Sequence, residues 1–211
     1  MRQNPSFTLA DPEAIKRLVR ENPWATIVSS TSEGLVASHY PFLLDETEDD
    51  LVLLSHVGRP DEQLHELGEH EVMVIFQGPH GYISPGWYDA KPAVPTWNFV
   101  TAHLHGVPEI LSDEENYRVL AQLTDHFEDR MPEPFRMERT PENVAYAQRI
   151  YKGTVGIRLR VSRFTAKAKL SQNKLPEVAA SILEQLETGE QYRNPRLAAE
   201  MRTFWTDERL P

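Results

Sequence analysis

Four aromatic side chains lie close together in the middle of the chain, in a segment that is also rich in proline. They fall within sixteen residues and are Tyr82, Trp87, Tyr88 and Trp97, with Pro85, Pro92 and Pro95 among them. Aromatic side chains bury a large area when something flat or apolar covers them. A proline-stiffened loop between strands is also a suitable place to hold a functional group. Two interpretations follow: the loop covers its own core, or it shapes a pocket for a planar ligand.

A basic segment near the end of the chain has the composition of an anion site. No acidic residue occurs between residues 158 and 174, and the basic residues there are Arg158, Arg160, Arg163, Lys167, Lys169 and Lys174. The formal net charge of the whole chain is −10, so a segment of this kind favours an anionic partner. Arg and Lys neutralise a phosphate while backbone amides orient it. The alternative is a solvated sheet face that balances the acidic helices.

The pair His103 and His105 is the best candidate for metal ligation. Residues two apart on a strand point to one face, so both imidazoles could meet one ion. A stable site needs three or four ligands, and the nearest acid is Glu109, so a polar strand face is favoured and no metal is predicted. The chain also has no G-x-G-x-x-G, Walker, G-x-S-x-G or H-E-x-x-H motif, which argues against a Rossmann nucleotide site and common hydrolase chemistry.

The elements that must position these residues are mostly short strands. Alternating or continuous apolar patterns predict strands at 24–31, 35–44, 51–56, 72–77, 98–107 and 154–161. The Ser-Glu-Gly at 32–34 predicts a hairpin between the first pair. A Gly-Pro-His-Gly turn is expected at 78–81, and a loop is expected after residue 161.

Helices are predicted around these strands. Helix starts are indicated by Asp11-Pro12, by Pro60, by the capping box of Ser112 and Glu115, by Thr140-Pro141 and by Asn194-Pro195. Helical spacing of apolar residues adds a helix at 175–186. In the helix at 112–128, the expected buried face consists of Tyr117, Leu120, Leu123 and Phe127. The fold class is therefore α+β, mainly antiparallel β, a barrel with peripheral helices.

Composition limits the class of protein. The chain has 211 residues, of which 40% are hydrophobic, and this suits a single domain over 1–211 with C-terminal helices from about residue 175. No run of eighteen apolar residues occurs, so no membrane span is expected. The absence of cysteine excludes disulfides and thiolate chemistry and is typical of a cytoplasmic protein.

Two separated motifs carry a resemblance to a known family. The first is YISP at 82–85, WY at 87–88 and VPTWN at 94–98, and the second is KLSQNK at 169–174. In this order they resemble the signature of the PaiB-type family, described as FMN-binding negative transcriptional regulators. The resemblance runs from the first helix to about Thr188. It implies a split β-barrel FMN-binding fold, related to flavin reductases and pyridoxamine phosphate oxidases, that acts as a homodimer.

The resemblance also implies a set of flavin-binding residues. The segment Ser55 to Arg59 matches the part of the split barrel that follows the third strand, where Arg59 takes the place of a phosphate-binding cation. Lys169 and Gln172 resemble positions that reach the flavin of the partner subunit. His39 and Tyr40 are expected to line the same side as Arg59, and the ring is expected to meet Thr96, Trp97 and Asn98. The complete predicted set is His39, Tyr40, Ser55, His56, Arg59, Thr96, Trp97, Asn98, Lys169 and Gln172.

The resemblance leaves the reaction open, so the protein is either a flavin-dependent oxidoreductase or a flavin sensor. A direct DNA-binding repressor is one alternative, with Arg193, Arg196 and Arg202 on a recognition helix. The acidic residues Glu200, Asp207 and Glu208 reduce the positive charge of this segment, and the net charge of the chain disfavours DNA binding. A haem-binding or haem-degrading split barrel is another, since eight histidines could supply an axial ligand. A deazaflavin could also replace FMN.

Overall fold

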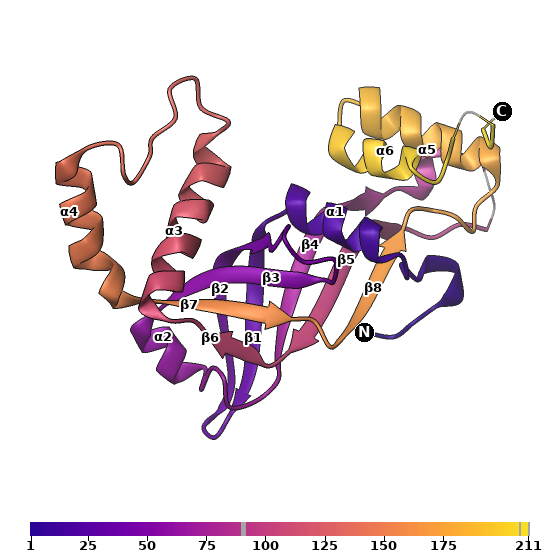
Figure 1. Ribbon diagram of the computed structural model, residues 1–211. Coiled ribbons are helices and arrows are strands. Elements are labelled where there is room, and N and C mark those ends of the chain that lie inside the picture. Colours follow the sequence, from indigo (N-terminus) through magenta and orange to yellow (C-terminus); the bar gives the residue numbers. More distant parts are fainter. Residues whose placement is uncertain (90–91, 207, 211) are drawn as a thin grey trace. The chain divides into compact units, whose positions relative to one another are not determined.

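The computed structural model describes residues 1–89, 92–206 and 208–210. Eight strands form one sheet in the order β6-β7-β3-β2-β1-β4-β5-β8. The pairings of β1 with β2 and β4, and of β7 with β3 and β6, are antiparallel. The mainly antiparallel α+β class predicted from the sequence is therefore confirmed (Figure 1).

Contacts divide the chain into two compact units, which are described separately. Unit 1 contains residues 1–11, 77–102 and 165–211, and unit 2 contains residues 12–76 and 103–164. The division falls within three strands, β4, β5 and β8. The single domain over 1–211 stays a prediction, because compact packing units do not show which parts fold alone.

Unit 2 holds most of the sheet. Its elements are α1 (Pro12–Glu21), β1 (Trp24–Thr31), β2 (Gly34–Leu44), β3 (Val52–Gly58), α2 (Arg59–Leu64), β6 (Pro108–Ile110), α3 (Asp113–Glu128), α4 (Pro141–Ile150), η3 (Tyr151–Gly153) and β7 (Thr154–Arg160). The hairpin predicted around residues 32–34 is confirmed, with Thr31 opposite Gly34. The strand β3 is buried on both faces, as its continuous apolar run predicts.

The capping residues predicted from the sequence mark the starts of α3 and α4 in the structure. Ser112 and Glu115 form both halves of the predicted capping box at the start of α3. The Thr140 side chain accepts a hydrogen bond from Asn143 N at the start of α4. The buried face of α3 agrees with the prediction only at Leu123. Tyr117 and Leu120 are half-buried and Phe127 is 40% exposed, whereas Asn116 and Val119 are buried. Asn116 Nδ2 donates to the carbonyl oxygen of Thr154, a bond that ties α3 to the start of β7.

The buried side chain of His65 links the end of α2 to the strands β1 and β2. The His65 side chain is completely buried, and its ring nitrogens lie 2.8 Å from Ser29 Oγ and 2.9 Å from Ser38 Oγ. The residue follows α2, while the two serines belong to β1 and β2. Burial lowers the pKa of His65, so the ring is neutral at pH 7 and each of its nitrogens has a partner.

The helices of unit 1 are η1 (Pro5–Phe7), η2 (Pro85–Trp87), α5 (Pro176–Thr188) and α6 (Pro195–Arg202). The unit also contains residues 77–83 of β4 (Val72–Ile83), residues 96–102 of β5 (Thr96–Gly106) and residues 165–169 of β8 (Arg163–Lys169). The helices α5 and α6 pack on each other and bury Ile182, Leu186, Leu197 and Met201 (Figure 1). Asn194 caps α6 as predicted, with its side chain accepting from Leu197 N. Trp205 donates a hydrogen bond of 3.0 Å to the carbonyl oxygen of Leu170.

Two predictions about the strands were wrong. The residues 78–81 form no turn, because β4 continues from Val72 to Ile83. The glycine there serves a close approach: a Cβ on Gly81 would lie only 2.9 Å from Leu197 Cδ2 of α6. The segment after residue 161 is also no loop, since residues 163–169 form β8.

Candidate functional site

The lysines of the basic segment stand apart from its arginines. We call Lys167, Lys169 and Lys174, which lie in unit 1, the lysine cluster. Burial lowers the pKa of Lys169, and the neighbouring charges of Lys167 and Lys174 lower it further. Among the described residues, no carboxylate forms a salt bridge with any of these lysines. A bound anion would relieve this repulsion.

The turn after β8 is fixed by side-chain hydrogen bonds. Gln172 forms two of them with the backbone of the turn: Oε1 accepts from Leu170 N at 2.7 Å, and Nε2 donates to Ala168 O at 2.6 Å. Ser171 sits in the left-handed region at φ 65°. The Lys169 ammonium donates a hydrogen bond to Thr96 Oγ1 on β5. The Gln172 side chain therefore fixes the backbone of the turn, and the Thr96 side chain positions Lys169.

Asn98 is a buried member of the same arrangement. Its side chain is fully buried, and Nδ2 donates to Ser171 Oγ at 2.9 Å and to Met201 Sδ at 3.4 Å. These bonds join β5 to the turn after β8 and to α6. The predicted contact of Asn98 and Thr96 with the edge of a ring stays a prediction, whereas their part in holding the turn is visible in the structure.

The aromatic residues of unit 1 combine both interpretations given by the sequence. Tyr88 is buried, with Lys174 Nζ 5.6 Å from its ring centroid, so part of the loop covers the core. Trp97 is 55% exposed and meets Tyr82 edge-on with ring centroids 6.2 Å apart. Tyr192 extends this aromatic set, at 5.3 Å from the Tyr82 centroid and 6.4 Å from that of Trp87. Residues 90 and 91 of the loop lie outside the described residues.

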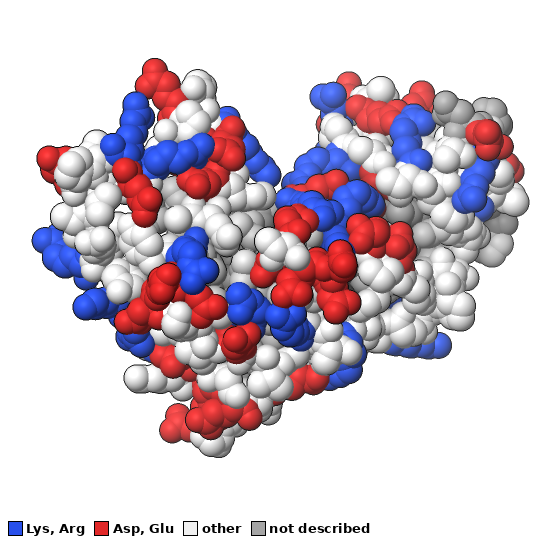
Figure 2. Space-filling view, in the orientation of Figure 1, with Lys and Arg blue, Asp and Glu red and all other residues white. Residues whose placement is uncertain are grey.

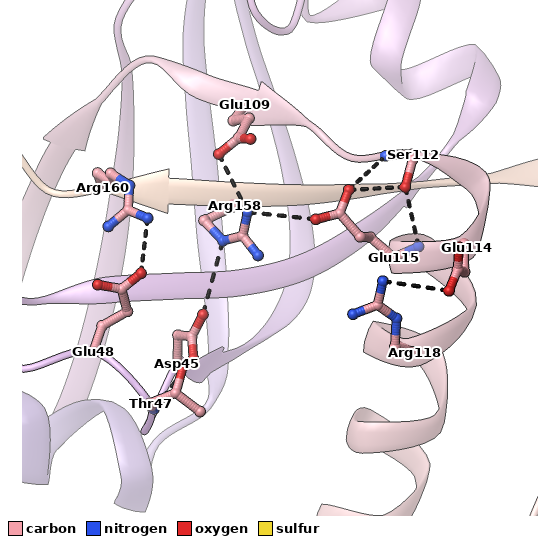
Figure 3. Close-up of polar contacts among 10 residues, drawn as sticks. All are labelled: Asp45, Thr47, Glu48, Glu109, Ser112, Glu114, Glu115, Arg118, Arg158 and Arg160. Carbon is pink, nitrogen blue, oxygen red and sulfur yellow. Dashed lines mark hydrogen bonds and ion pairs between the residues drawn. The ribbon is translucent and has the colours of Figure 1, made fainter.

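Unlike the lysines, the arginines of the basic segment are neutralised. We call Arg158, Arg160 and Arg163, in unit 2, the arginine cluster. Arg158 lies 3.4 Å from Glu109, 3.8 Å from Glu115 and 3.8 Å from Asp45. Arg160 pairs with Glu48 at 2.8 Å, and Figure 3 shows both groups of contacts. Arg163 pairs with Glu71. Carboxylates therefore already occupy the cations in the first half of the segment, and an anion site in its second half stays a prediction.

Acidic and basic side chains are interleaved over the face shown in Figure 2, and they do not gather into one basic field. The arginines of the candidate recognition helix are also engaged within the protein. Arg202 forms a bidentate ion pair with the Glu187 carboxylate, and Arg193 Nε donates to the Glu187 carbonyl oxygen. Asp207, which the sequence also placed there, lies outside the described residues.

In unit 2, the structure brings together Tyr40, His56 and Arg59 around the end of β3. The Tyr40 hydroxyl donates to Asp61 Oδ2 at 2.6 Å and accepts from Gly58 N at 3.3 Å, and burial raises the pKa of this tyrosine. The ring of His56 lies edge-on to Tyr40 at 6.3 Å. Arg59 donates to the carbonyl oxygen of Lys152 at 2.5 Å and lies 3.6 Å from Asp113.

The other predicted residues of unit 2 lie elsewhere. Ser55 is completely buried, and its hydroxyl donates to the carbonyl oxygen of Pro41 at 2.6 Å, which ties β3 to β2. His39 is exposed and faces Thr26 in the ladder with β1. The expectation that His39 and Tyr40 line the same side was wrong, because consecutive side chains of the strand β2 point to opposite faces.

The described residues contain no group of three or more His, Cys, Asp or Glu that could hold a metal ion. In the same part of the chain, no helix is long and apolar enough to cross a membrane.

Sequence reasoning missed several residues around these sites. Tyr192 joins the aromatic set from far downstream in a left-handed conformation at φ 57°, and no local signal predicts this contact. Ser171, in contrast, lies inside the KLSQNK motif and could have been included on that ground. Asp61 lies two residues beyond Arg59, but its bond to Tyr40 depends on how α2 packs.

Comparison with known proteins identifies the family. Residues 1–163 match the family described as "Putative FMN-binding domain". Over 197 residues the chain is 30% identical to the protease synthase and sporulation protein PAI 2 of Bacillus subtilis, and the match covers 92% of this chain and 93% of that protein. The PaiB-type resemblance is thereby confirmed.

Solved structures confirm the split barrel. The FAD and Heme binding protein of Mycobacterium smegmatis matches with a TM-score of 0.57 and 19% identity, over 77% of this chain and 73% of that one. The flavocytochrome Anf3 of Azotobacter vinelandii matches with a TM-score of 0.59 and 14% identity, over 80% of this chain and 72% of that one. At these identities the likeness shows the fold alone. The family match, in turn, supports FMN as the predicted cofactor, and the chain belongs to the FMN-binding domain family of the PaiB type.

Proposed function

We propose that this protein is an FMN-dependent redox protein in which the lysine cluster holds the phosphate of the flavin. The observation that carries the proposal is a set of three ammonium groups around Lys169 that form no salt bridge among the described residues. Burial lowers the pKa of Lys169, and the charges of Lys167 and Lys174 lower it further. A phosphate within reach of Lys169 and Lys174 would exchange this repulsion for charge-assisted hydrogen bonds. FMN combines one phosphate with one flat ring, and this anatomy suits lysines that lie in the same unit as exposed aromatic side chains.

The aromatic residues of unit 1 would cover the ring. Trp97 and Tyr192 are 55% and 61% exposed, so both have free surface to place against a planar group. Bound FMN supplies the redox chemistry, while the protein contributes binding, orientation and exclusion of water. Tyr40, His56 and Arg59 of unit 2 remain part of the predicted flavin-binding set. For Arg59 to bind a phosphate, the anion would have to compete with Asp113, which lies 3.6 Å away.

A homodimer and a cytoplasmic location complete the proposal. The dimer follows from the resemblance, which assigns Lys169 and Gln172 to the flavin of the partner subunit. If this assignment is correct, FMN affinity falls when the protein is diluted below its dimerisation constant.

Regulation through direct DNA binding has less support. The net charge of −10 opposes contact with a phosphate backbone, and Arg193 and Arg202 both bond to Glu187. A regulatory role without DNA contact remains compatible with flavin binding. Retention on DNA that weakens steeply with salt would restore the repressor hypothesis.

The visible spectrum of the purified protein is the first test, followed by FMN titration with tryptophan fluorescence as the readout. We expect two flavin bands, or saturable quenching at micromolar FMN, with oxidation of NAD(P)H as the next assay. One intense violet band would indicate haem instead. A colourless protein without quenching would show that this chain does not bind flavin.

A further inference from the structure

A pocket in unit 2 is separate from the lysine cluster and has a different chemistry. It lies between α3 and α4, over the end of β3, and has a volume of about 370 Å³. We call it the α4 pocket; the lining residues used below are His56, Leu120, Phe135, Tyr146, Ala147 and Ile150. Its volume lies within the range of sites that take small organic molecules, which is roughly 300–1,000 Å³. In Figure 1, α3 and α4 stand beside each other, joined by the loop that carries Phe135.

The lining of the α4 pocket is apolar and uncharged. None of its lining residues is Asp, Glu, Lys or Arg. Phe135, Tyr146 and Ile150 are 44%, 56% and 50% exposed, so a large part of their apolar surface faces water. Removing such surface from water is favourable. An anionic or cationic ligand would find no counterion here, which favours a neutral one.

One polar side chain of the pocket lacks a partner. Nδ1 of His56 is buried and makes no hydrogen bond within the described part of the chain. Burial lowers the pKa of His56, so its ring is neutral at pH 7. A neutral imidazole offers one donor and one acceptor, and a buried nitrogen without a partner is costly. Because Nδ1 is buried, a ligand in the pocket can bond this ring only at Nε2, which forms no hydrogen bond within the described residues.

We propose that the α4 pocket binds a neutral aromatic molecule of one or two rings, whose hydroxyl or carbonyl group forms a hydrogen bond with the His56 imidazole. The volume of the pocket limits the size of the ligand. The aromatic and aliphatic lining favours an aromatic ligand, and the absence of charged lining residues favours a neutral one. A small molecule is favoured over a second copy of the chain because the site is concave and its single histidine ring forms no hydrogen bond at Nε2 within the described residues. The observations used here concern unit 2 without a cofactor, and His56 also belongs to the predicted flavin-binding set, so FMN bound at His56 would compete with the proposed ligand.

Three related probes test the proposal on the full-length protein. They are 2-naphthol, which is neutral with one hydroxyl, naphthalene, which lacks the hydroxyl, and 2-naphthoate, which is an anion. Ligand-observed NMR titrations would give the dissociation constants. We expect saturable binding of 2-naphthol, with naphthalene up to about 10-fold weaker because it cannot make the hydrogen bond. We expect 2-naphthoate to bind more weakly than both.

Two alanines of α4 supply a matched pair of variants. Ala147 lines the pocket and is 9% exposed, whereas Ala145 is exposed on another side of the same helix. Ala147→Leu should fill the pocket and abolish binding of 2-naphthol, while Ala145→Leu should leave it unchanged. His56→Phe should keep naphthalene binding but remove the preference for 2-naphthol. This last variant decides the matter if Ala147→Leu does not fold.

Several outcomes would overturn the proposal. The first is the absence of saturable binding of any probe, and the second is equal loss in Ala147→Leu and Ala145→Leu. The third is an unchanged preference for 2-naphthol in His56→Phe. A fourth is that no probe binds while Ala147→Leu alone converts a dimer to a monomer, which would make this surface a subunit interface.

Discussion

The two halves of one basic segment behave in opposite ways. The arginine cluster, in unit 2, is paired with carboxylates throughout, with Arg158 near Asp45, Glu109 and Glu115. The lysine cluster, in unit 1, forms no salt bridge within the described residues, and burial together with the charges of Lys167 and Lys174 lowers the pKa of Lys169. The first half therefore supports the fold, and the second half is the part for which we propose an anionic ligand.

The difference shows that a series of basic residues in a sequence does not indicate which of them form salt bridges in the fold. The partners of the arginines come from distant positions: Glu48 lies 112 residues from Arg160, and Glu71 lies 92 residues from Arg163. Only the sheet brings these side chains together. Among the described residues the lysines have no such carboxylate partner, and this makes them better candidates for phosphate binding than their number alone would.

The largest effect is expected from Lys169→Gln on FMN affinity. Losing one charge-assisted hydrogen bond to a phosphate should weaken binding by about 10- to 100-fold. The free energy of unfolding should change little, since the Lys169 side chain bonds only Thr96 among the described residues. Fluorescence titration with FMN and urea unfolding measure the two quantities.

Arg118→Gln is the control for net charge. Arg118 lies on α3, pairs with Glu114 at 3.7 Å and has a side chain that is 64% exposed. This variant removes the same charge from unit 2, so it should leave FMN affinity unchanged. Equal weakening in both variants would mean that net charge controls binding, and the lysine cluster would lose its proposed role.

A smaller effect is expected from Arg158→Met, and it should fall on stability. The Asp45 side chain is only 12% exposed, so removing the guanidinium leaves a nearly buried carboxylate without its counterion. We expect the free energy of unfolding to fall by about 1–3 kcal/mol, measured by urea unfolding. FMN affinity measured on the folded variant should stay the same. If this variant lost FMN binding while remaining folded, the distinction between the two clusters would be wrong.

Local signals account for much of what the sequence predicted about the fold. The hairpin at 32–34 and the caps at Ser112, Thr140 and Asn194 depend on a few neighbouring residues, and the structure confirms them. Two strand predictions failed for different reasons. Glycine and proline at 78–81 are typical of turns, but Gly81 is needed where Leu197 approaches β4. The strand β8 has small or basic residues at most positions, so its apolar pattern is weak.

The candidate site was predictable only in part. The motif residues Thr96, Asn98, Lys169 and Gln172 do belong to one connected arrangement in unit 1. Their individual roles depend on side-chain directions that spacing does not reveal: Asn98 points into the core and bonds Ser171, while Trp97 beside it is exposed. Tyr192 reaches the aromatic set through a tertiary contact alone.

The smallest effect is expected from Arg160→Gln, which tests whether exposed members of the arginine cluster matter. Arg160 and Glu48 form an exposed pair, and its guanidinium lowers the pKa of Glu48 below the ordinary 4.5. A lowered carboxyl pKa adds stability that is present above pH 4.5 and is lost as the pH falls through the folded-state value. The melting temperature of the variant should therefore drop slightly at pH 7 in low salt. The difference should vanish in acid, and also at about 1 M salt, where charges are screened within about 3 Å. A difference that persists in high salt would instead indicate that the Arg160 side chain contributes through packing.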